Sequence, residues 1–214
     1  MITVWGRRSS SNVQPVMWCL EELNIPHTRI DAGFTYGVVD TEAYLAMNPN
    51  GTVPTIQDGD NPPIWESGAI LRYLAAKFAD DDFWPSATVD RARVDQWAEW
   101  SKLNIALAFT GPIFWRVART PVERRDPIAI SSAVEAFERA LSIADSQLET
   151  NSYLAGENFT LADIHFAHVL FRYYDLPIAR KKLHAVEEYY DRIKQRTAYQ
   201  QHIAISYAEL VPTE

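Results

Sequence analysis

The chain has 214 residues, 47% hydrophobic and 22% charged, so it can bury one large core or two modest ones, and its composition argues against disorder. Its 20 Lys and Arg against 28 Asp and Glu give a formal net charge of −8, which disfavours nucleic acid as a partner. There is no signal-peptide pattern, and no apolar run approaches the roughly 18 residues that a membrane helix needs. We therefore expect a cytoplasmic protein that contacts no membrane.

The first part of the chain alternates strand and helix patterns. In chain order it predicts a strand over 2–5, a helix opened by Pro15, a strand over 27–31, a short helix capped by Thr41, a hairpin of strands over 55–57 and 63–65, and a helix from Ser67. This βαβαββα order suits one mixed sheet with helices on its faces. The single Cys19 excludes an internal disulfide and falls on the buried face of the first helix. We expect an α/β domain over residues 1–79.

The rest of the chain shows only helical patterns. A polar segment over about 80–87, broken by Pro85, predicts a linker to an all-helical domain over 88–214. Helices are predicted over 90–117, 127–149, 161–174, 182–196 and 199–209. Gly111-Pro112 should bend the first of these and turn the residues after it toward the first domain.

Polar residues Ser9-Ser10-Ser11-Asn12 lie between the first strand and the first helix. Hydroxyls and an amide in this position commonly cap the helix. The same groups can donate hydrogen bonds to an anion, which the helix N-terminus already favours. Both interpretations remain open from these residues alone.

Two further segments suit the parts of a small peptide. In Thr52-Val53-Pro54 the proline either starts a strand or is cis, and a cis proline would leave the Val53 backbone N–H and C=O free to pair with an extended ligand. In Glu66-Ser67 the serine is predicted to be an N-cap. This helix start also suits a carboxylate, and Glu66 suits an ammonium, so the pair fits the α-amino-acid end of a ligand.

The combined pattern resembles the cytosolic glutathione S-transferases, in particular bacterial serine-type members of theta, phi or nu-like kind. It is carried by Ser10-x-Asn12 before Leu20-Glu21-Glu22, by the runs 48–54 and 66–74, and by the hydrophobic-staple and capping-box segment 159–163. The resemblance covers essentially the whole chain. It implies a thioredoxin-like first domain, an all-helical second domain, a homodimer, glutathione as cosubstrate and a role in detoxification.

The resemblance also implies roles for individual residues. Val53 would pair with the cysteinyl part of glutathione beside a cis Pro54 and Thr52, and Glu66 and Ser67 would hold the γ-glutamyl end. In the first loop, Ser10 falls at the serine-type catalytic position, Asn12 falls where some bacterial members use asparagine, and Ser11 competes because adjacent serines leave the register open by one. A donor aimed at the sulfur would lower the thiol pKa from about 8.5.

Two parts of the resemblance leave contacts open. Thr52 replaces the longer Gln or Lys of many relatives, and the loop 38–40 lacks the His or Lys that often meets the glycyl carboxylate. Arg7 or Arg8 is an alternative there, and solvated surface is the plainer interpretation of both. Trp115, beyond the predicted bend, is implied to line the pocket of the second substrate.

Competing functions remain to be separated. Asp163, His165 and His168 invite a metal site, but Asp163 fits a capping box begun by Thr160, and we expect no metal. The leading hypothesis is transfer of glutathione to a small hydrophobic electrophile. The first alternative is a glutathione-dependent isomerase, dehalogenase or disulfide reductase. The lack of a Ser-x-Cys pattern in the first loop counts against an isomerase. A disulfide reductase that uses Asn12 remains open, because it needs no protein cysteine. The second is a non-enzymatic binding module on the same fold.

Overall fold

A computed structural model describes residues 1–212 of the chain. Its first half consists of β1 (Ile2–Trp5), α1 (Gln14–Glu22), β2 (His27–Ile30), the 3₁₀ turn η1 (Phe34–Tyr36), α2 (Glu42–Met47), β3 (Thr55–Asp58), β4 (Ile64–Trp65) and α3 (Ser67–Phe78). The sheet order is β2-β1-β3-β4, with β1 parallel to β2 and antiparallel to β3, and β3 antiparallel to β4. The predicted βαβαββα order is confirmed.

Helix α1 shows why these residues form these elements. Pro15 lies in the first turn, where the missing N–H costs nothing, and Val16, Cys19 and Leu20 are all fully buried on one face. Asn24 then adopts a positive φ of 52° and ends the helix. Cys19 is therefore a core residue, as expected.

The second half is helical. One continuous helical rod is made of α4 (Thr88–Trp100), the π-helical segment η2 (Ser101–Ala106), α5 (Leu107–Phe109), the π-helical segment η3 (Thr110–Trp115) and α6 (Arg116–Ala118). After the 3₁₀ turn η4 (Val122–Arg124) come α7 (Pro127–Leu148), α8 (Leu161–Ala167), α9 (Leu170–Asp175), α10 (His184–Ile193), α11 (Thr197–His202) and the 3₁₀ turn η5 (Ala208–Leu210). Among the described residues no strand follows β4, apart from an isolated bridge between Tyr153 and Gly156.

Three of the predicted helices differ in detail. Gly111-Pro112 lies inside η3, where proline removes a backbone donor and the helix widens. The helix expected over 161–174 is interrupted, because the His168 ring is hydrogen-bonded to the backbone oxygen of His165 (2.9 Å), an acceptor that a continuing helix would use. The last predicted helix is wrong beyond His202, where Ile203 and Ala204 both donate to the Tyr199 carbonyl and close α11.

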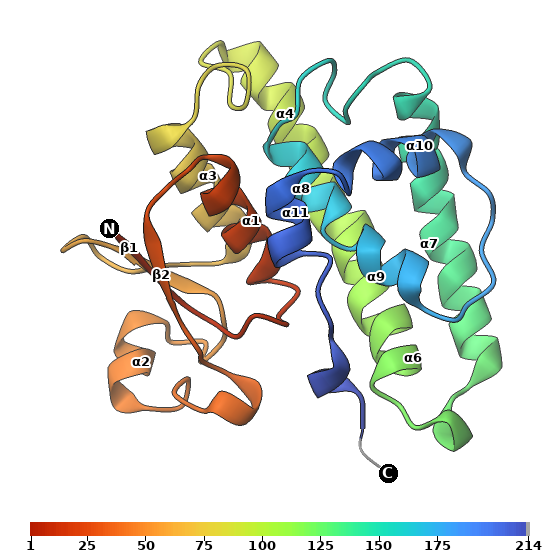
Figure 1. The fold of residues 1–214 in the computed structure, drawn as a ribbon, viewed down its shortest axis with the longest axis horizontal. Coiled ribbons are helices and arrows are strands. Elements are labelled where there is room, and N and C mark those ends of the chain that lie inside the picture. Colours follow the sequence, from red (N-terminus) through yellow and green to blue (C-terminus); the bar gives the residue numbers. More distant parts are fainter. Residues whose placement is uncertain (213–214) are drawn as a thin grey trace.

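The two halves share one hydrophobic core. In Figure 1 the sheet with α1, α2 and α3 forms one side of the molecule, the helices from α4 onward form the other, and α11 returns beside α1. Helix α1 packs against α3, α8 and α11. No helix within residues 1–212 is long and apolar enough to cross a bilayer.

The start of α8 is fixed by the predicted capping box. The Asp163 carboxylate accepts from the N–H of Leu154 (3.0 Å) and of Thr160 (2.8 Å) and from the Tyr189 hydroxyl (3.0 Å). Burial raises the pKa of Asp163 to about 6. The capping interpretation of Asp163 is confirmed.

Candidate active site

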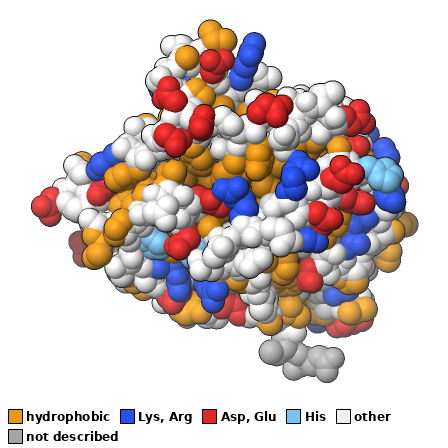
Figure 2. All heavy atoms as spheres, turned by 45° about the horizontal axis from the view of Figure 1, so that its top comes forward, with side chains coloured by type: hydrophobic (Ala, Val, Ile, Leu, Met, Phe, Trp, Pro, Cys, Tyr) orange, Lys and Arg blue, Asp and Glu red, His pale blue; other side chains and the backbone are white. Residues whose placement is uncertain are grey.

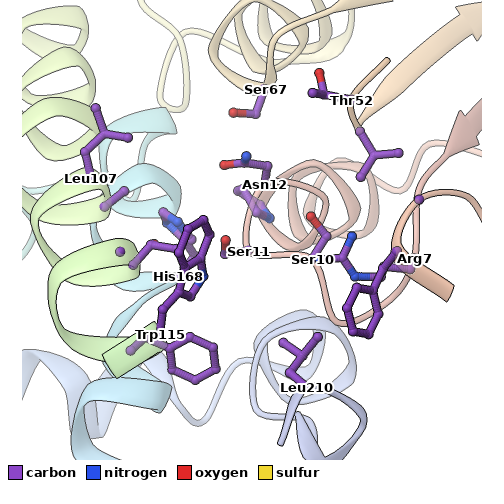
Figure 3. A pocket seen from close by; sticks show the side chains of 18 of the residues that line it. Arg7, Ser10, Ser11, Asn12, Thr52, Ser67, Leu107, Trp115, His168 and Leu210 are labelled. Atoms are coloured by element: carbon purple, nitrogen blue, oxygen red, sulfur yellow. The ribbon is translucent and has the colours of Figure 1, made fainter. Parts of the chain in front are cut away.

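A cavity of about 540 Å³ opens between the two halves and is lined by both. We call its lining from the first half (residues 7–67) the first wall, and its lining from the second half (residues 102–172 and Leu210) the second wall. Figure 3 shows that Ser10, Ser11, Asn12, Thr52 and Ser67 of the first wall meet around the same opening, across from Leu107, Trp115 and His168.

The loop before α1 presents unpaired donors to this opening. The Ser10 carbonyl accepts from the N–H of Val13 (3.0 Å) and of Gln14 (2.9 Å), so a turn precedes the helix. The N–H groups of Ser11 and Asn12 have no acceptor among the described residues, and they lie at the positive end of α1. Ser10, Ser11 and Asn12 all line the cavity, whereas the Ser9 hydroxyl donates to Glu209. The loop can therefore hold an anion.

The segment before β3 has the geometry predicted from its proline. The Val53–Pro54 peptide bond is cis, and neither the N–H nor the C=O of Val53 is hydrogen-bonded within residues 1–212. The neighbouring Thr52 carbonyl is held by the Tyr44 hydroxyl (2.6 Å) and the Asn48 side-chain amide (2.9 Å). Thr52 and Val53 line the cavity, and Pro54 is buried behind them.

The start of α3 corrects one prediction. Ser67 is not the N-cap: the capping position is Glu66, which has a positive φ of 69° and gives no side-chain cap. Ser67 is instead the first helical residue and lines the cavity. A non-glycine residue in this strained conformation is typical of functional sites. The Glu66 carboxylate lies beside the site, 3.1 Å from Nζ of Lys102 on the second wall.

The second wall combines aromatic rings with buried nitrogen groups. Trp115, the predicted pocket residue, lines the cavity and is half exposed, and Phe114 beside it is buried. His165 and His168 also line it; burial lowers the pKa of His165 to about 3 and that of His168 to about 4, so both rings are neutral near pH 7. Among the described residues no cluster of ligands suits a metal ion.

Arg172 is a lining residue that the motifs did not indicate. It is only 3% exposed, its guanidinium donates to the Ser9 carbonyl (2.7 Å), and it lies over the Phe114 ring at 4.7 Å. Burial lowers its pKa to about 10, which leaves it charged near pH 7. The available signal was a single arginine inside the apolar run 161–173. Its charge lies directly behind the loop that carries Ser10.

The two arginines of the first loop have separate places. Arg7 lines the cavity beside Phe34, with its guanidinium 5.3 Å from the ring centroid. Arg8 is exposed, does not line the cavity and donates to the Gln201 carbonyl (2.9 Å). Of the two, only Arg7 can meet a ligand in this cavity.

Comparisons with known proteins agree on one family. The profiles of the glutathione S-transferase N-terminal and C-terminal domains match residues 9–77 and 104–197. Glutathione S-transferase GstB of Escherichia coli strain K12 is 32% identical over 206 residues, which cover 96% of this chain and 99% of GstB. The protein belongs to the glutathione S-transferase family. This membership makes it a glutathione transferase, as the motifs predicted.

Two other relatives show the range of proteins built on this fold. A theta-class glutathione S-transferase from Xanthomonas axonopodis pv. citri, solved with glutathione bound, has a TM-score of 0.89 and 40% identity over 96% of this chain and 98% of its own. An elongation factor 1-gamma from Prunus avium is 38% identical over 132 residues, which are 61% of this chain and 30% of that protein. The thioredoxin-like and helical architecture of the glutathione S-transferases is confirmed for this chain.

Proposed function

We propose that this glutathione S-transferase holds glutathione along the first wall and uses the Ser10 hydroxyl to stabilise the thiolate, which attacks a small hydrophobic electrophile. The observation that carries the proposal is that two segments with unpaired backbone groups line one cavity. Ser11 and Asn12, whose N–H groups are unpaired, line the same cavity as Val53, whose N–H and C=O are also unpaired among the described residues.

The free groups of the first wall match the tripeptide in order. Val53 would pair its backbone with the cysteinyl residue of glutathione as an added strand does. Ser67 and the N-terminus of α3 would receive the γ-glutamyl carboxylate, and Glu66 would receive its ammonium. Thr52, whose carbonyl is already held by Tyr44 and Asn48, would support Val53 from the side.

The same loop can lower the pKa of the bound thiol. A free thiol has a pKa of about 8.5, so most of it is protonated near neutral pH. A hydroxyl donor from Ser10, the N–H of Ser11 and the positive end of α1 each stabilise the thiolate relative to the thiol. The buried charge of Arg172 behind the Ser9 carbonyl acts in the same direction. The sulfur would then form a bond to the electrophilic carbon.

Ser10 is favoured over its neighbours because of its surroundings. It is 6% exposed, and its backbone N–H and C=O are both engaged, whereas Asn12 is exposed to solvent. A hydrogen bond to a thiolate is stronger where water is excluded, and a fixed donor loses less entropy in making it.

Three alanine variants test this assignment. We expect Ser10→Ala to raise the pKa of enzyme-bound glutathione by about one unit or more and to slow turnover about tenfold or more, because one unit corresponds to about 1.4 kcal/mol of thiolate stabilisation. The thiolate is followed by its ultraviolet absorbance as pH is varied, and turnover is followed with a chloronitrobenzene. Ser11→Ala and Asn12→Ala are the matched comparisons. A larger effect in either of them would move the catalytic role to that residue.

We further propose that the enzyme works as a cytoplasmic homodimer and serves detoxification. Exposed apolar side chains on the earlier part of the long helical rod support a dimer, with Val89 67% and Leu103 57% exposed. Sedimentation should give about twice the chain mass of 24.4 kDa. A mass of one chain at micromolar concentration would contradict the dimer.

A further inference from the structure

The charges that line the cavity are all of one sign. Arg7, Lys102, Arg119 and Arg172 line it, and within residues 1–212 no Asp or Glu does. The whole chain carries a formal net charge of −8, and on the face drawn in Figure 2 acidic and basic side chains are interspersed. The cavity is therefore a positively charged site in an acidic protein.

One of these cations is already paired, and three are not. Lys102 lies 3.1 Å from the Glu66 carboxylate. Arg7, Arg119 and Arg172 have no carboxylate oxygen within 4.0 Å among the described residues. Arg172 donates to the Ser9 carbonyl and is committed to the loop. Arg7 and Arg119 remain available to a ligand.

Arg7 and Arg119 converge from opposite walls on one aromatic ring. Their guanidinium carbons lie 5.3 Å and 5.4 Å from the Phe34 ring centroid, and that of Arg119 lies 5.3 Å from the Trp115 ring. The Nε of Arg7 is buried without an acceptor in the part of the chain that the structure describes. Burial lowers the pKa of Arg7, the Glu209 carboxylate raises it, and the charge of Arg119 lowers it by a smaller amount. Two like charges are thus held near each other, and an anion between them would relieve their repulsion.

This arginine pair lies at the end of the cavity away from the proposed γ-glutamyl site. In Figure 3, Thr52 and Ser67 lie on one side of Ser10 and Ser11, and Trp115 and Leu210 lie on the other. Arg7 is drawn beside Ser10 and level with it, and Arg119 stacks on Trp115. The pair therefore borders the space left for the electrophile.

We propose that the electrophile carries a carboxylate on an aromatic body, with Arg7 and Arg119 binding the carboxylate and Phe34 and Trp115 contacting the body. This inference rests on the proposed function and narrows its substrate class. With an aryl enone as the electrophile, the thiolate sulfur forms a bond to the β-carbon, the alkene π pair forms a π bond between the α-carbon and the carbonyl carbon, and the carbonyl π pair moves to the oxygen. A proton from water then reaches the α-carbon. The carboxylate is unchanged and serves only in binding.

A matched pair of substrates tests the carboxylate. The probes are a para-acylated phenoxyacetic acid whose acyl group is an enone, and its neutral methyl amide; the reactive carbons are the same and distant from the change. At saturating glutathione we expect kcat/KM for the acid to exceed that for the amide about tenfold, since charge-assisted bidentate hydrogen bonds are strong in a partly buried site. Equal values for the two substrates would overturn the inference.

Variants then assign the preference to the arginine pair. R119Q should lower kcat/KM for the acid about tenfold more than for the amide, and R119K should retain part of the preference because it keeps the charge. R139Q removes an exposed arginine of α7 outside the cavity and should leave both values unchanged. The pair does not bind the electrophile's carboxylate if R119Q lowers kcat/KM equally for the acid and the amide. The same conclusion follows if R119Q raises KM for glutathione while the preference for the acid persists.

Binding measurements keep this test separate from that of the proposed function. Turnover of the neutral amide tests transfer alone. If neither substrate reacts, the quenching of tryptophan fluorescence still compares their binding to the glutathione-loaded protein. Tighter binding of the acid, weakened about tenfold in R119Q, supports the anion site even without transfer. Equal binding of acid and amide overturns it even if the amide is turned over.

Discussion

The two walls of the cavity are built from different kinds of group. Around the proposed glutathione site the first wall offers backbone N–H and C=O groups and short hydroxyls, such as those of Ser11, Val53 and Ser67. Its Arg7 and Phe34 lie apart from this group, next to the second wall's Arg119. The second wall offers rings and long nitrogen side chains: Trp115 and Arg172 lie within helical segments, and Arg119 directly follows α6. Backbone groups suit a ligand that never changes, whereas projecting side chains can be exchanged without altering the fold. We therefore expect the glutathione end of the first wall to tolerate little change, and the second wall, together with Arg7 and Phe34, to determine the choice of the second substrate.

The largest expected effect is a loss of stability at acidic pH, and it arises from the second wall. His165 and His168 of the second wall are buried and neutral, with pKa values of about 3 and 4 in place of 6.5, so the unfolded chain binds two more protons there as pH falls below 6.5. Asp163, with its pKa raised to about 6, opposes this by one proton below pH 6. Together these three groups take up one proton net on unfolding, which lowers the free energy of unfolding by about 1.4 kcal/mol per pH unit between pH 6 and 4. His202, whose pKa burial also lowers, adds to this slope. Denaturant unfolding at several pH values measures this slope.

A histidine variant isolates the contribution of the second wall. H165Q removes one of the two protons taken up, so its slope over the same range should be smaller by about 1.4 kcal/mol per pH unit. His184 is exposed on α10, and H184Q is the control. Carboxylates elsewhere contribute equally to all three proteins. An unchanged slope in H165Q would show that the ring is not held neutral in the native state.

A smaller effect is expected at Gly6, directly before the first wall. Gly6 precedes the serine loop, and an added Cβ would overlap Cγ2 of Val13 and lie 3.3 Å from its Cγ1. Val13 is fully buried and β-branched, so the loop rather than the side chain must move. We expect G6A to destabilise the protein by about 2 kcal/mol and to raise the pKa of bound glutathione by shifting Ser10. G59A is the control, since its added Cβ meets no atom within 4 Å and both sites have positive φ. Equal stability and equal thiol pKa in G6A would show that the loop is not set by this contact.

The smallest effect is expected for the hydrogen bond from Tyr44 to the Thr52 carbonyl, next to Val53. Y44F removes the hydroxyl that donates to the Thr52 carbonyl (2.6 Å), while the Asn48 amide still binds that carbonyl. The free energy of unfolding should fall by about 1 kcal/mol, and KM for glutathione should rise several-fold because the free groups of Val53 are less well held. The Tyr153 hydroxyl is bonded to no described residue, so Y153F is the control. A change in KM for the electrophile alone would contradict the assignment of this segment to glutathione.

The sequence allowed the first wall to be predicted far better than the second. Ser10 to Asn12, Thr52-Val53 and Ser67 all line the cavity, because each stands in a short motif at the end of an element and its position follows from local geometry. The N-cap prediction for Ser67 was wrong because Glu66 adopts a positive φ and takes the capping position itself. A sequence indicates a positive φ mainly through glycine or asparagine, so a glutamate gives no sign of it.

On the second wall only Trp115 was predicted. Arg119 follows α6 and Arg172 lies in α9, both distant in sequence from Phe34 and Ser9, and their meeting depends on how these helices pack. The division between α8 and α9 was missed for a related reason. It depends on a side-chain hydrogen bond of His168, which an apolar periodicity cannot indicate.

The burial of Cys19 has a consequence for the proposed reaction with an electrophile. It is the one cysteine of the chain, it is fully buried in α1, and burial raises the pKa of its thiol. Neither the thiolate form nor a path to a reagent is available in the folded protein. An electrophile that enters the cavity would therefore meet no cysteine sulfur of the protein, so the proposed reaction would not alkylate the enzyme at a thiol.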